Sequence, residues 1–394
     1  MSRGAARHPA SQSPRCPPRP GRPRHPTPTR PFTLRLTPAA EPAKRYGDQQ
    51  AINACTLLPL SSAYALGLRL LPAAYTDETY IEGDVPPAAI SAQHPDIGPG
   101  TTSCAYQFVD EPHGQGRGLF IDVAQPPFSS WPDTEPVKTY DLHDLRVALL
   151  PRPRPTGFDA APYLASLSRG QDLYVRVVLF TEAAESDAAG SLKGVIDAVA
   201  TTLHAGRFTD AATVSYAPPY EAAADPCLLF TAADFALAAP DKTPVGRVTR
   251  RAGNSETKVL SPRSPGGQYS AETRCTRRSD DAHQDGLGVH NSTSVTMTVR
   301  THRDADMARA MVDEFLDPSS QVSDAFGASV GVDVAIGDIA FVAPLGVEWS
   351  FGVLAGPFVV SLEVYDHGAY LTDAAELVRR LAPVARQIVD RLPR

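Results

Sequence analysis

The chain has 394 residues, 42% of them hydrophobic, which is enough to bury a core in each of two or three domains of ordinary size. Its formal net charge of -7 is unevenly distributed, because residues 1–45 carry ten Arg and Lys against one Glu, about +9, and leave about -16 for the remainder. An acidic body, in a chain with 7% aromatic residues, lacks the basic, aromatic-rich face of nucleic-acid-binding proteins. We therefore expect no nucleic-acid partner.

Residues 1–45 are dominated by Arg and Pro, a composition that buries too little apolar surface to offset the entropy of ordering. We predict a disordered tail there, and Cys16 within it is predicted to be a free thiol without a chemical role. No signal peptide is recognisable, because no apolar run of about 7 to 15 residues occurs in this segment.

Beyond the tail, two cysteine pairs recur at nearly the same spacing. Cys55 and Cys104 enclose 48 residues, Cys227 and Cys275 enclose 47, and the second pair follows the first by 172 and 171 residues. Each first cysteine lies beside a short helix-like stretch, and each second cysteine opens a strand-like stretch. This pattern favours one disulfide per pair that joins a helix to a sheet, although four cysteines allow three pairings.

The repeated spacing predicts two tandem modules, residues 46–208 and 222–394, joined by a linker at 209–221 that contains Pro218 and Pro219. Each module is expected to be α+β, with a twisted antiparallel sheet, helices packed on it and one internal disulfide.

The first module is predicted to begin with a short helix after Cys55. Ser61 or Ser62 is expected to cap this helix, because a serine hydroxyl accepts a hydrogen bond from a free amide at a helix start. Gly67 is expected to end it, because glycine tolerates the left-handed backbone that follows a helix.

The remainder of the first module is predicted to contain both strands and helices. Extended stretches at 105–109, 119–124 and 173–180 predict strands. Two helices are expected: one is capped by Asp159 and carries the apolar residues Tyr163, Leu164 and Leu167, and the other closes the module with an amphipathic pattern at 192–203.

The second module is the fuller copy. Thr231 with Asp234 three residues later resembles a capping box, and the aromatic-Ala-Leu trio at 64–66 returns at 235–237. Asp304 is expected to cap a later helix. A C-terminal amphipathic helix follows, which Pro383 is predicted to kink or divide.

Strands are predicted in the second module at 295–301, 333–342, 347–354 and 358–365. The apolar stretch that includes the last three is interrupted by Asp333, Asp338 and Glu348, so no run of about 18 uncharged apolar residues survives. We therefore expect strands joined by tight turns there, and no transmembrane span.

Two short motifs resemble catalytic signatures. The tripeptide His302-Arg303-Asp304 resembles a kinase catalytic loop, but the phosphate-covering loop, strand lysine and metal-binding Asp that kinases need are missing around it. A glycine run at 114–118 precedes a strand instead of following one, which indicates a hairpin loop and not a nucleotide site.

Other chemistry has equally little support in the sequence. The ten histidines are scattered, no metal-ligand spacing occurs, and no serine-nucleophile motif is present, so we predict no metal, no cofactor and no catalytic residue. The neighbouring acidic residues Asp77 and Glu78 are interpreted as solvated loop charges.

Two disulfides indicate an oxidising compartment, because cytosolic proteins rarely keep such bonds. Since no export signal is visible, we expect that the native protein starts elsewhere or that this chain is a fragment of a longer exported one. The alternative is a cytosolic protein with four reduced thiols, whose paired Cα atoms would lie more than about 7 Å apart.

The motif D-P-C at 225–227 is followed by an apolar helix, by Cys275 on a strand, and by further strands and a C-terminal helix. This arrangement resembles an actinobacterial secreted or lipoprotein domain of unknown function, and the related extracellular sensor domain of mycobacterial Ser/Thr kinases. The first module departs from the motif with N-A-C at 53–55. The resemblance implies binding or sensing outside the cell and transfers no catalytic residue.

We therefore expect an exported, non-catalytic protein of the cell envelope that binds an unknown small ligand or envelope component. The alternative is a hydrolase-type enzyme with its site between the two modules. A carboxylate or histidine with a shifted pKa in a deep pocket between the modules would favour the enzyme, whereas a shallow groove would favour binding.

Overall fold

The structure, a computed structural model, describes residues 34–38, 45–46, 49–50, 52–70, 75–81, 100–108, 118–125, 135–151, 161–170, 172–181, 185–206, 212–242, 244–257, 268–279, 293–319, 329–345, 348–366, 369–371 and 373–393. Cys16, Asp159 and most of the glycine run at 114–118 lie outside these residues. Pro31–Arg394 belong to one compact unit.

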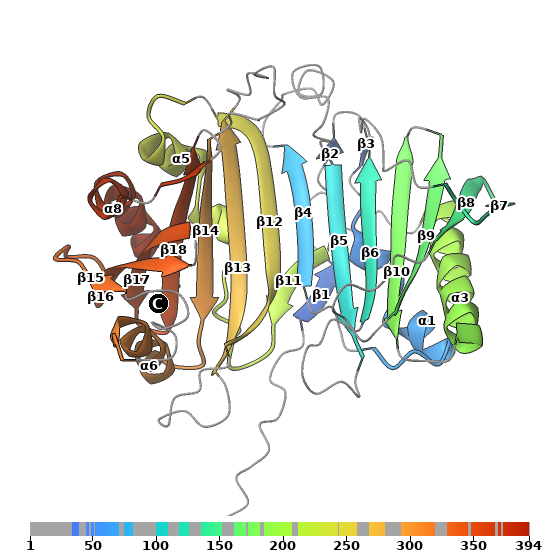
Figure 1. Cartoon of the computed structure of the whole chain (residues 1–394), viewed down its shortest axis with the longest axis horizontal. Coiled ribbons are helices and arrows are strands. Elements are labelled where there is room, and N and C mark those ends of the chain that lie inside the picture. Colours follow the sequence, from blue (N-terminus) through green and yellow to red (C-terminus); the bar gives the residue numbers. More distant parts are fainter. Residues whose placement is uncertain are drawn as a thin grey trace, which may run out of the picture. The chain divides into compact units, whose positions relative to one another are not determined.

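Most described strands join in one antiparallel sheet of 15 strands (Figure 1). The first half of the chain contributes β4 (Tyr75–Ile81), β5 (Gly100–Gln107), β6 (Gly118–Gln125), β7 (Lys138–Leu142), β8 (Leu145–Leu150), β9 (Ala161–Arg169) and β10 (Leu173–Thr181). The second half contributes β12 (Pro244–Thr257), β13 (Gln268–Ser279), β14 (Ser294–Thr301), β15 (Val330–Gly331), β16 (Ile339–Leu345), β17 (Glu348–Ala355), β18 (Phe358–Asp366) and β19 (Ala369–Tyr370). The expected separate sheets are therefore joined into one.

Strand order is the same in the two halves. The first half runs β4-β5-β6-β10-β9-β8-β7 and the second runs β12-β13-β14-β18-β17-β16-β15, and the two first strands, β4 and β12, pair with each other. The helices of the first half are η1 (Ala54–Thr56), α1 (Leu60–Ala65) and α3 (Glu185–His204), and those of the second are α4 (Pro226–Leu229), α5 (Ala232–Ala238), α6 (Ala305–Leu316) and α8 (Ala374–Arg391). No helix of the described residues is both long and apolar enough to cross a membrane.

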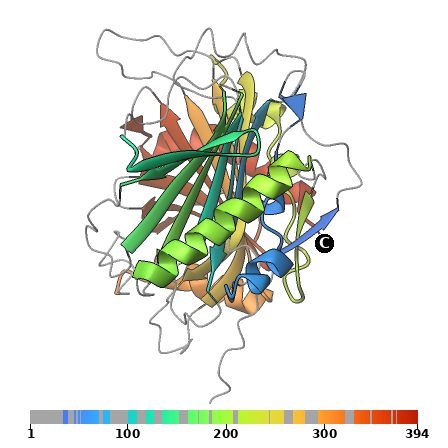
Figure 2. The same cartoon turned by 90° about the vertical axis from the view of Figure 1, so that its right-hand side faces the viewer.

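One face of the sheet carries the hydrophobic core. In the first half the core lies between the strands and η1, α1 and α3, and Figure 2 shows α3 running diagonally across the strands. In the second half α4, α5 and α8 cover the strands. Tyr80 and Val248 lie opposite each other in the second core, and Thr76, on the same side of β4, lies opposite Cys104 of the first core. Both cores therefore occupy the same face.

The opposite face carries ion pairs and α6. Each ion pair joins directly opposed residues of neighbouring strands: Asp122–Arg176, Asp77–Arg251 and Glu272–Arg300. Such cross-strand pairs of unlike charge stabilise a sheet modestly. At the far end of the sheet, α6 packs Met311 and Val312 against Phe341 and Val359.

Both expected disulfides are present. Cys55 bonds Cys104 with the Cα atoms 5.0 Å apart, and Cys227 bonds Cys275 at 5.1 Å. The first bond ties η1 to β5, and the second ties α4 to β13, so each attaches a short helix to the sheet. In the chain-entropy interpretation, closing a loop of this length stabilises the fold by about 4 kcal/mol.

Two segments predicted to lack regular structure contain strands. β1 (Leu34–Pro38) falls within the predicted tail, and β11 (Ala212–Tyr216) falls within the predicted linker; the two pair antiparallel. Tyr216 is buried, and its hydroxyl donates to the carbonyl oxygen of Gly253 at 2.9 Å. The prediction missed β1 because it used the Arg and Pro content of residues 1–45 as a whole, and the alternating sequence LRLTP of β1 is a short part of that segment.

The helix expected after Asp159 is instead strand β9. Ala165 and Leu167 point into the core cluster, and β9 pairs with β10 on one side and β8 on the other. Tyr163 and Leu167 are four residues apart, a spacing that also fits a helix face, and this ambiguity explains the wrong prediction.

Helix α1 begins differently from expectation. Its N-cap is Pro59, without a side-chain hydrogen bond, so neither Ser61 nor Ser62 caps it. Gly67 follows the helix with φ +77°, as expected from its permissive backbone.

In the second half, Thr231 and Asp234 form the expected capping box of α5. The predicted match of the trios at 64–66 and 235–237 is shifted by one residue, because Phe235 is fully buried and Tyr64 is 52% exposed. Ala63, also fully buried, occupies the place of Phe235.

Helix α8 continues through Pro383 as one helix, so the predicted division does not occur.

The pairing of β4 with β12 is symmetric about one residue pair. Glu78 lies opposite Arg250, which follows it by 172 residues, and the neighbouring partners run in opposite order on either side. The same separation relates Asn53 to Asp225, each two residues before the first cysteine of its pair. Corresponding positions of the two halves therefore meet in the centre of the sheet.

Unlike charges occupy this central pair. Arg250 donates hydrogen bonds to Glu78 and to Asp225, and Asn53 donates to Glu78 at 3.2 Å. The side chains of Arg250 and Glu78 are only 18% and 14% exposed. Asn53 and Asp225 also accept hydrogen bonds from the backbone N–H groups of Cys55 and Cys227, each at 2.9 Å.

The prediction that Asp77 and Glu78 are loop charges is wrong, because both residues lie in strand β4. The alternation of apolar and polar residues in this strand is weak, so the sequence did not indicate a strand there.

We expect Glu78→Arg to lower the free energy of unfolding by about 3–5 kcal/mol, because it leaves like charges facing each other at a poorly hydrated site. The double variant E78R/R250E should recover only part of this loss, since its new carboxylate faces Asp225. Adding N53D and D225N exchanges the whole set and should restore stability to within about 1 kcal/mol. Urea unfolding with the disulfides intact measures each step, and wild-type stability of E78R would contradict the assignment.

Candidate ligand-binding site

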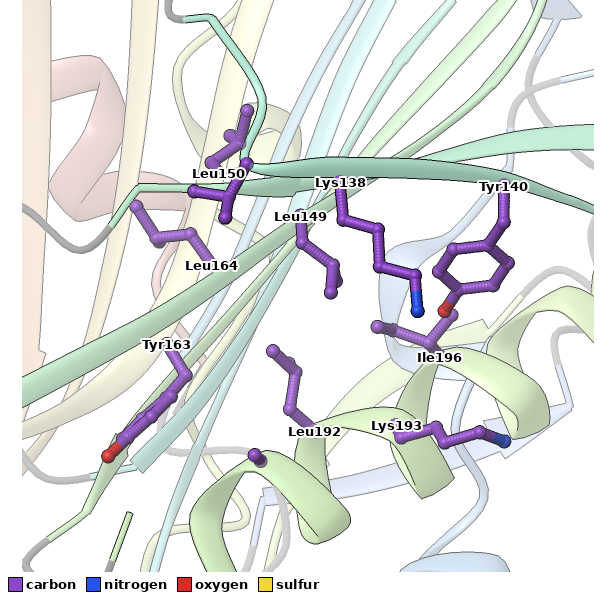
Figure 3. A pocket seen from close by; sticks show the side chains of 11 residues that line it. Lys138, Tyr140, Leu149, Leu150, Tyr163, Leu164, Leu192, Lys193 and Ile196 are labelled. Carbon is purple, nitrogen blue, oxygen red and sulfur yellow. The ribbon is translucent and has the colours of Figure 1, made fainter. Parts of the chain in front are cut away.

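A cavity of about 570 Å³ lies in the first half of the chain, between α3 and the strands β7, β8 and β9 (Figure 3). We call it the α3 cavity; it is lined by Val137, Lys138, Tyr140, Leu149, Leu150, Tyr163, Leu164, Ala189, Leu192, Lys193 and Ile196. Its volume falls in the range of about 300–1,000 Å³ that is typical of small-molecule sites.

The cavity exists because α3 carries small residues where it passes the edge of the sheet. Its first half contains Ala188 and Ala189, and Ala189 lines the cavity. Helix α8 of the second half instead buries Leu377 and Leu381 against the corresponding strands. Little side-chain volume therefore fills the space between α3 and the β7–β8 hairpin.

The wall is mainly aliphatic. In Figure 3, Leu149 from β8 and Leu192 from α3 face each other across the space, and Leu150 and Leu164 form one end. Leu192 is buried, and Ile196 is fully buried. Surfaces of this kind bind apolar groups by the hydrophobic effect and orient them through a few polar groups.

Two ammonium groups border the aliphatic wall. Lys193 on α3 forms an ion pair with Asp197 at 2.6 Å, one helical turn away. Lys138 reaches from β7 toward α3, and its Nζ lies 5.9 Å from the centre of the Tyr140 ring (Figure 3). Within the described part of the chain, no carboxylate forms an ion pair with Lys138.

Tyr140 is a neutral phenol at neutral pH. Burial raises its pKa, and the nearby charge of Asp197 raises it further, against a smaller opposing effect of Lys193. Tyr140 therefore offers a ring face and an uncharged hydroxyl, and it is not an activated base.

The arrangement can bind and orient a molecule, and its ionisable side chains are two lysines and two tyrosines. Among the described residues, no cluster of three or more His, Cys, Asp or Glu could hold a metal ion. The cavity lining contains no Asp, Glu, His, Ser or Cys.

None of the lining side chains was singled out as a site residue from the sequence. The amphipathic pattern at 192–203 predicted that α3 packs on a sheet, and this is correct. The signal that the sequence did contain is the run of Ala and Gly at the start of α3, but no strand was predicted where β7 and β8 lie. The sequence does not show which strands α3 packs against, so the small residues alone could not predict a cavity.

The tripeptide at 302–304 has a structural role. Asp304 caps α6, with its side chain accepting the backbone N–H of Met307 at 2.9 Å. His302 is 2% exposed, and burial lowers its pKa to about 4, with a smaller effect from Arg300.

The junction of the two halves holds a carboxyl group with a shifted pKa. Burial raises the pKa of Asp77, although Arg251 donates two hydrogen bonds to one of its oxygens, at 2.8 and 3.1 Å. Because this oxygen is occupied by a guanidinium, the geometry is that of a structural ion pair.

Comparison with known proteins adds little to this geometry. No protein-family model matches the chain, and no curated protein matches it by sequence. Among solved structures, the chain is weakly similar to the di-domain ARO/CYC StfQ from the steffimycin biosynthetic pathway, with 8% identity over 87% of this chain and 94% of that one. The TM-score of 0.15 carries no argument about fold or function.

We expect the stability of the protein to fall as the pH is lowered from about 6.5 to about 4, because His302 stays neutral in the folded state and takes up a proton on unfolding. His302 contributes its full stabilisation of the fold at pH values above the pKa that it has in the unfolded chain, and this contribution is about 3 kcal/mol at most. His302→Leu should flatten the change between pH 7 and pH 4.5 in urea unfolding. An unchanged pH profile in this variant would refute the assignment.

Proposed function

We propose that this chain is an exported, non-catalytic protein of the cell envelope that binds a small apolar molecule in the α3 cavity. The observation that carries the proposal is the cavity itself: about 570 Å³, aliphatic walls and two ammonium groups at its border. Concave, largely apolar sites with few polar groups are typical of small-molecule binding.

Export is supported by the two disulfides, which persist in oxidising compartments and are rare in the cytosol. The resemblance of the cysteine motif at 225–227 to actinobacterial secreted and sensor domains points the same way.

We further propose that the two halves are copies of one α+β module. The shared strand order, the matched disulfides and the symmetric pairing about Glu78 and Arg250 support this. In this scheme the first copy binds the ligand in the α3 cavity. In the second copy side chains of α8 fill the corresponding space, and this copy completes the sheet.

A hydrolase-type activity between the halves remains the alternative prediction. No observation on the described residues favours it over binding, since Asp77 at the junction is engaged by Arg251.

The neutral fluorophore N-phenyl-1-naphthylamine tests binding in the cavity. We expect its fluorescence to rise on titration with the protein, and Ala189→Trp to weaken binding at least tenfold because the indole fills the space. Gly190→Trp is the matched control: it adds the same side chain on the next residue, which does not line the cavity. Equal binding to both variants would place the probe elsewhere, and absence of binding to the wild type would refute the proposed function.

Cysteine labelling tests export. We expect Cys55, Cys104, Cys227 and Cys275 to resist maleimide in the denatured but unreduced protein isolated from its native host, and to react after reduction. Mass spectrometry counts the labels. Free thiols at these four positions before reduction would contradict the assignment to an oxidising compartment.

A further inference from the structure

The border of the α3 cavity carries an uncompensated positive charge. The charge of Lys193 is neutralised by Asp197 at 2.6 Å, whereas Lys138 has the face of Tyr140 near it and no carboxylate partner among the described residues. A cation that lies at 5.9 Å from an aromatic ring gains only about 0.5–1 kcal/mol at an exposed site. Lys138 therefore keeps most of its capacity to attract an anion.

The charge and the aliphatic wall lie at different parts of the space. Lys138 and Tyr140 come from β7, while Leu150 and Leu164 form the opposite end, with Leu192 between them (Figure 3). A ligand that satisfies both parts has one anionic end and an apolar body. A sugar or a nucleotide would instead lose its hydrogen bonds to water against the aliphatic wall without receiving replacements.

We infer that the α3 cavity takes an aliphatic carboxylate, with its chain along Leu149, Leu164 and Leu192 and its head group bound by Lys138. This inference rests on the proposed function and names the class of molecule bound at that site. The ammonium of Lys138 would donate a charge-assisted hydrogen bond to the carboxylate, and the neutral hydroxyl of Tyr140 stands next to that position.

Two ligand properties separate the contributions of head and chain. Each added methylene should tighten binding about fourfold until the cavity is full, because burial of a methylene is worth a fixed increment of free energy. The head group should change the affinity by a factor that depends on its charge and is the same for every length of the alkyl chain.

Isothermal titration calorimetry with decanoate, 1-decanol and decylamine, below their aggregation concentrations at pH 7.5, tests the head group. We expect decanoate to bind about three- to tenfold more tightly than the alcohol, and the amine to bind most weakly. Lys138→Gln should remove the advantage of the carboxylate over the alcohol and leave alcohol binding unchanged.

Arg309→Gln is the control, because it removes a positive charge from an exposed helical residue that is likewise paired four residues on, with Asp313, and does not line the cavity. We expect it to change decanoate binding less than twofold. Circular dichroism of each variant checks that the fold is intact, and Gln at these exposed positions leaves the core untouched.

The outcomes distinguish the two proposals. If decanoate and decanol bind equally, or if K138Q and R309Q shift decanoate binding alike, the inference fails while binding in the cavity stands. If none of the three compounds binds, and the fluorophore also does not bind, the proposed function fails together with the inference. If decanoate binds with unchanged affinity to Ala189→Trp, the carboxylate occupies another place and the inference is overturned.

Discussion

The pairing of β4 with β12 is the constraint on which the rest of the structure depends. Each of these strands is the first strand of its half in the large sheet, and their pairing joins seven strands of the first half and eight of the second into one continuous sheet. Glu78 and Arg250 sit at the centre of this pairing, and neither half alone contains both charges. Since the central position needs one residue of each sign, two identical halves could not make the same contact. The halves are therefore complementary at the place where they meet, and similar elsewhere.

The same strand order produces a filled core in one half and a hollow in the other. In the second half α8 is held by leucines beneath it and by Arg391, whose guanidinium pairs with the fully buried Asp234 of α5. In the first half α3 begins with small residues, and the strands opposite it at β7 and β8 belong to the end of the sheet. The difference in packing volume between the two helices, and not a difference in topology, creates the α3 cavity.

The sequence revealed local patterns well and long-range neighbours poorly. The disulfides, the capping box of α5, the cap of α6 and the two long helices were predictable, because each depends on residues close together in the chain or on a repeated spacing. Strand β9 was mistaken for a helix because its apolar residues fit both periods, and β1 was hidden by the composition around it. The cavity was not predictable, since its walls come from residues between 137 and 196 that only the strand order brings together.

The outer wall of the α3 cavity is built on β7, the last strand of the sheet among the described residues. β7 has hydrogen-bonded neighbours along one side only, through β8, whereas every strand near Glu78 and Arg250 is held on both sides. Separating β7 from β8 breaks the backbone bonds of one ladder and leaves the disulfide-tied centre unchanged. The wall of the cavity can then open locally at its rim, with a free-energy cost separate from that of global unfolding. The mobility of this wall and the thermal stability of the protein are thereby set by separate parts of one sheet.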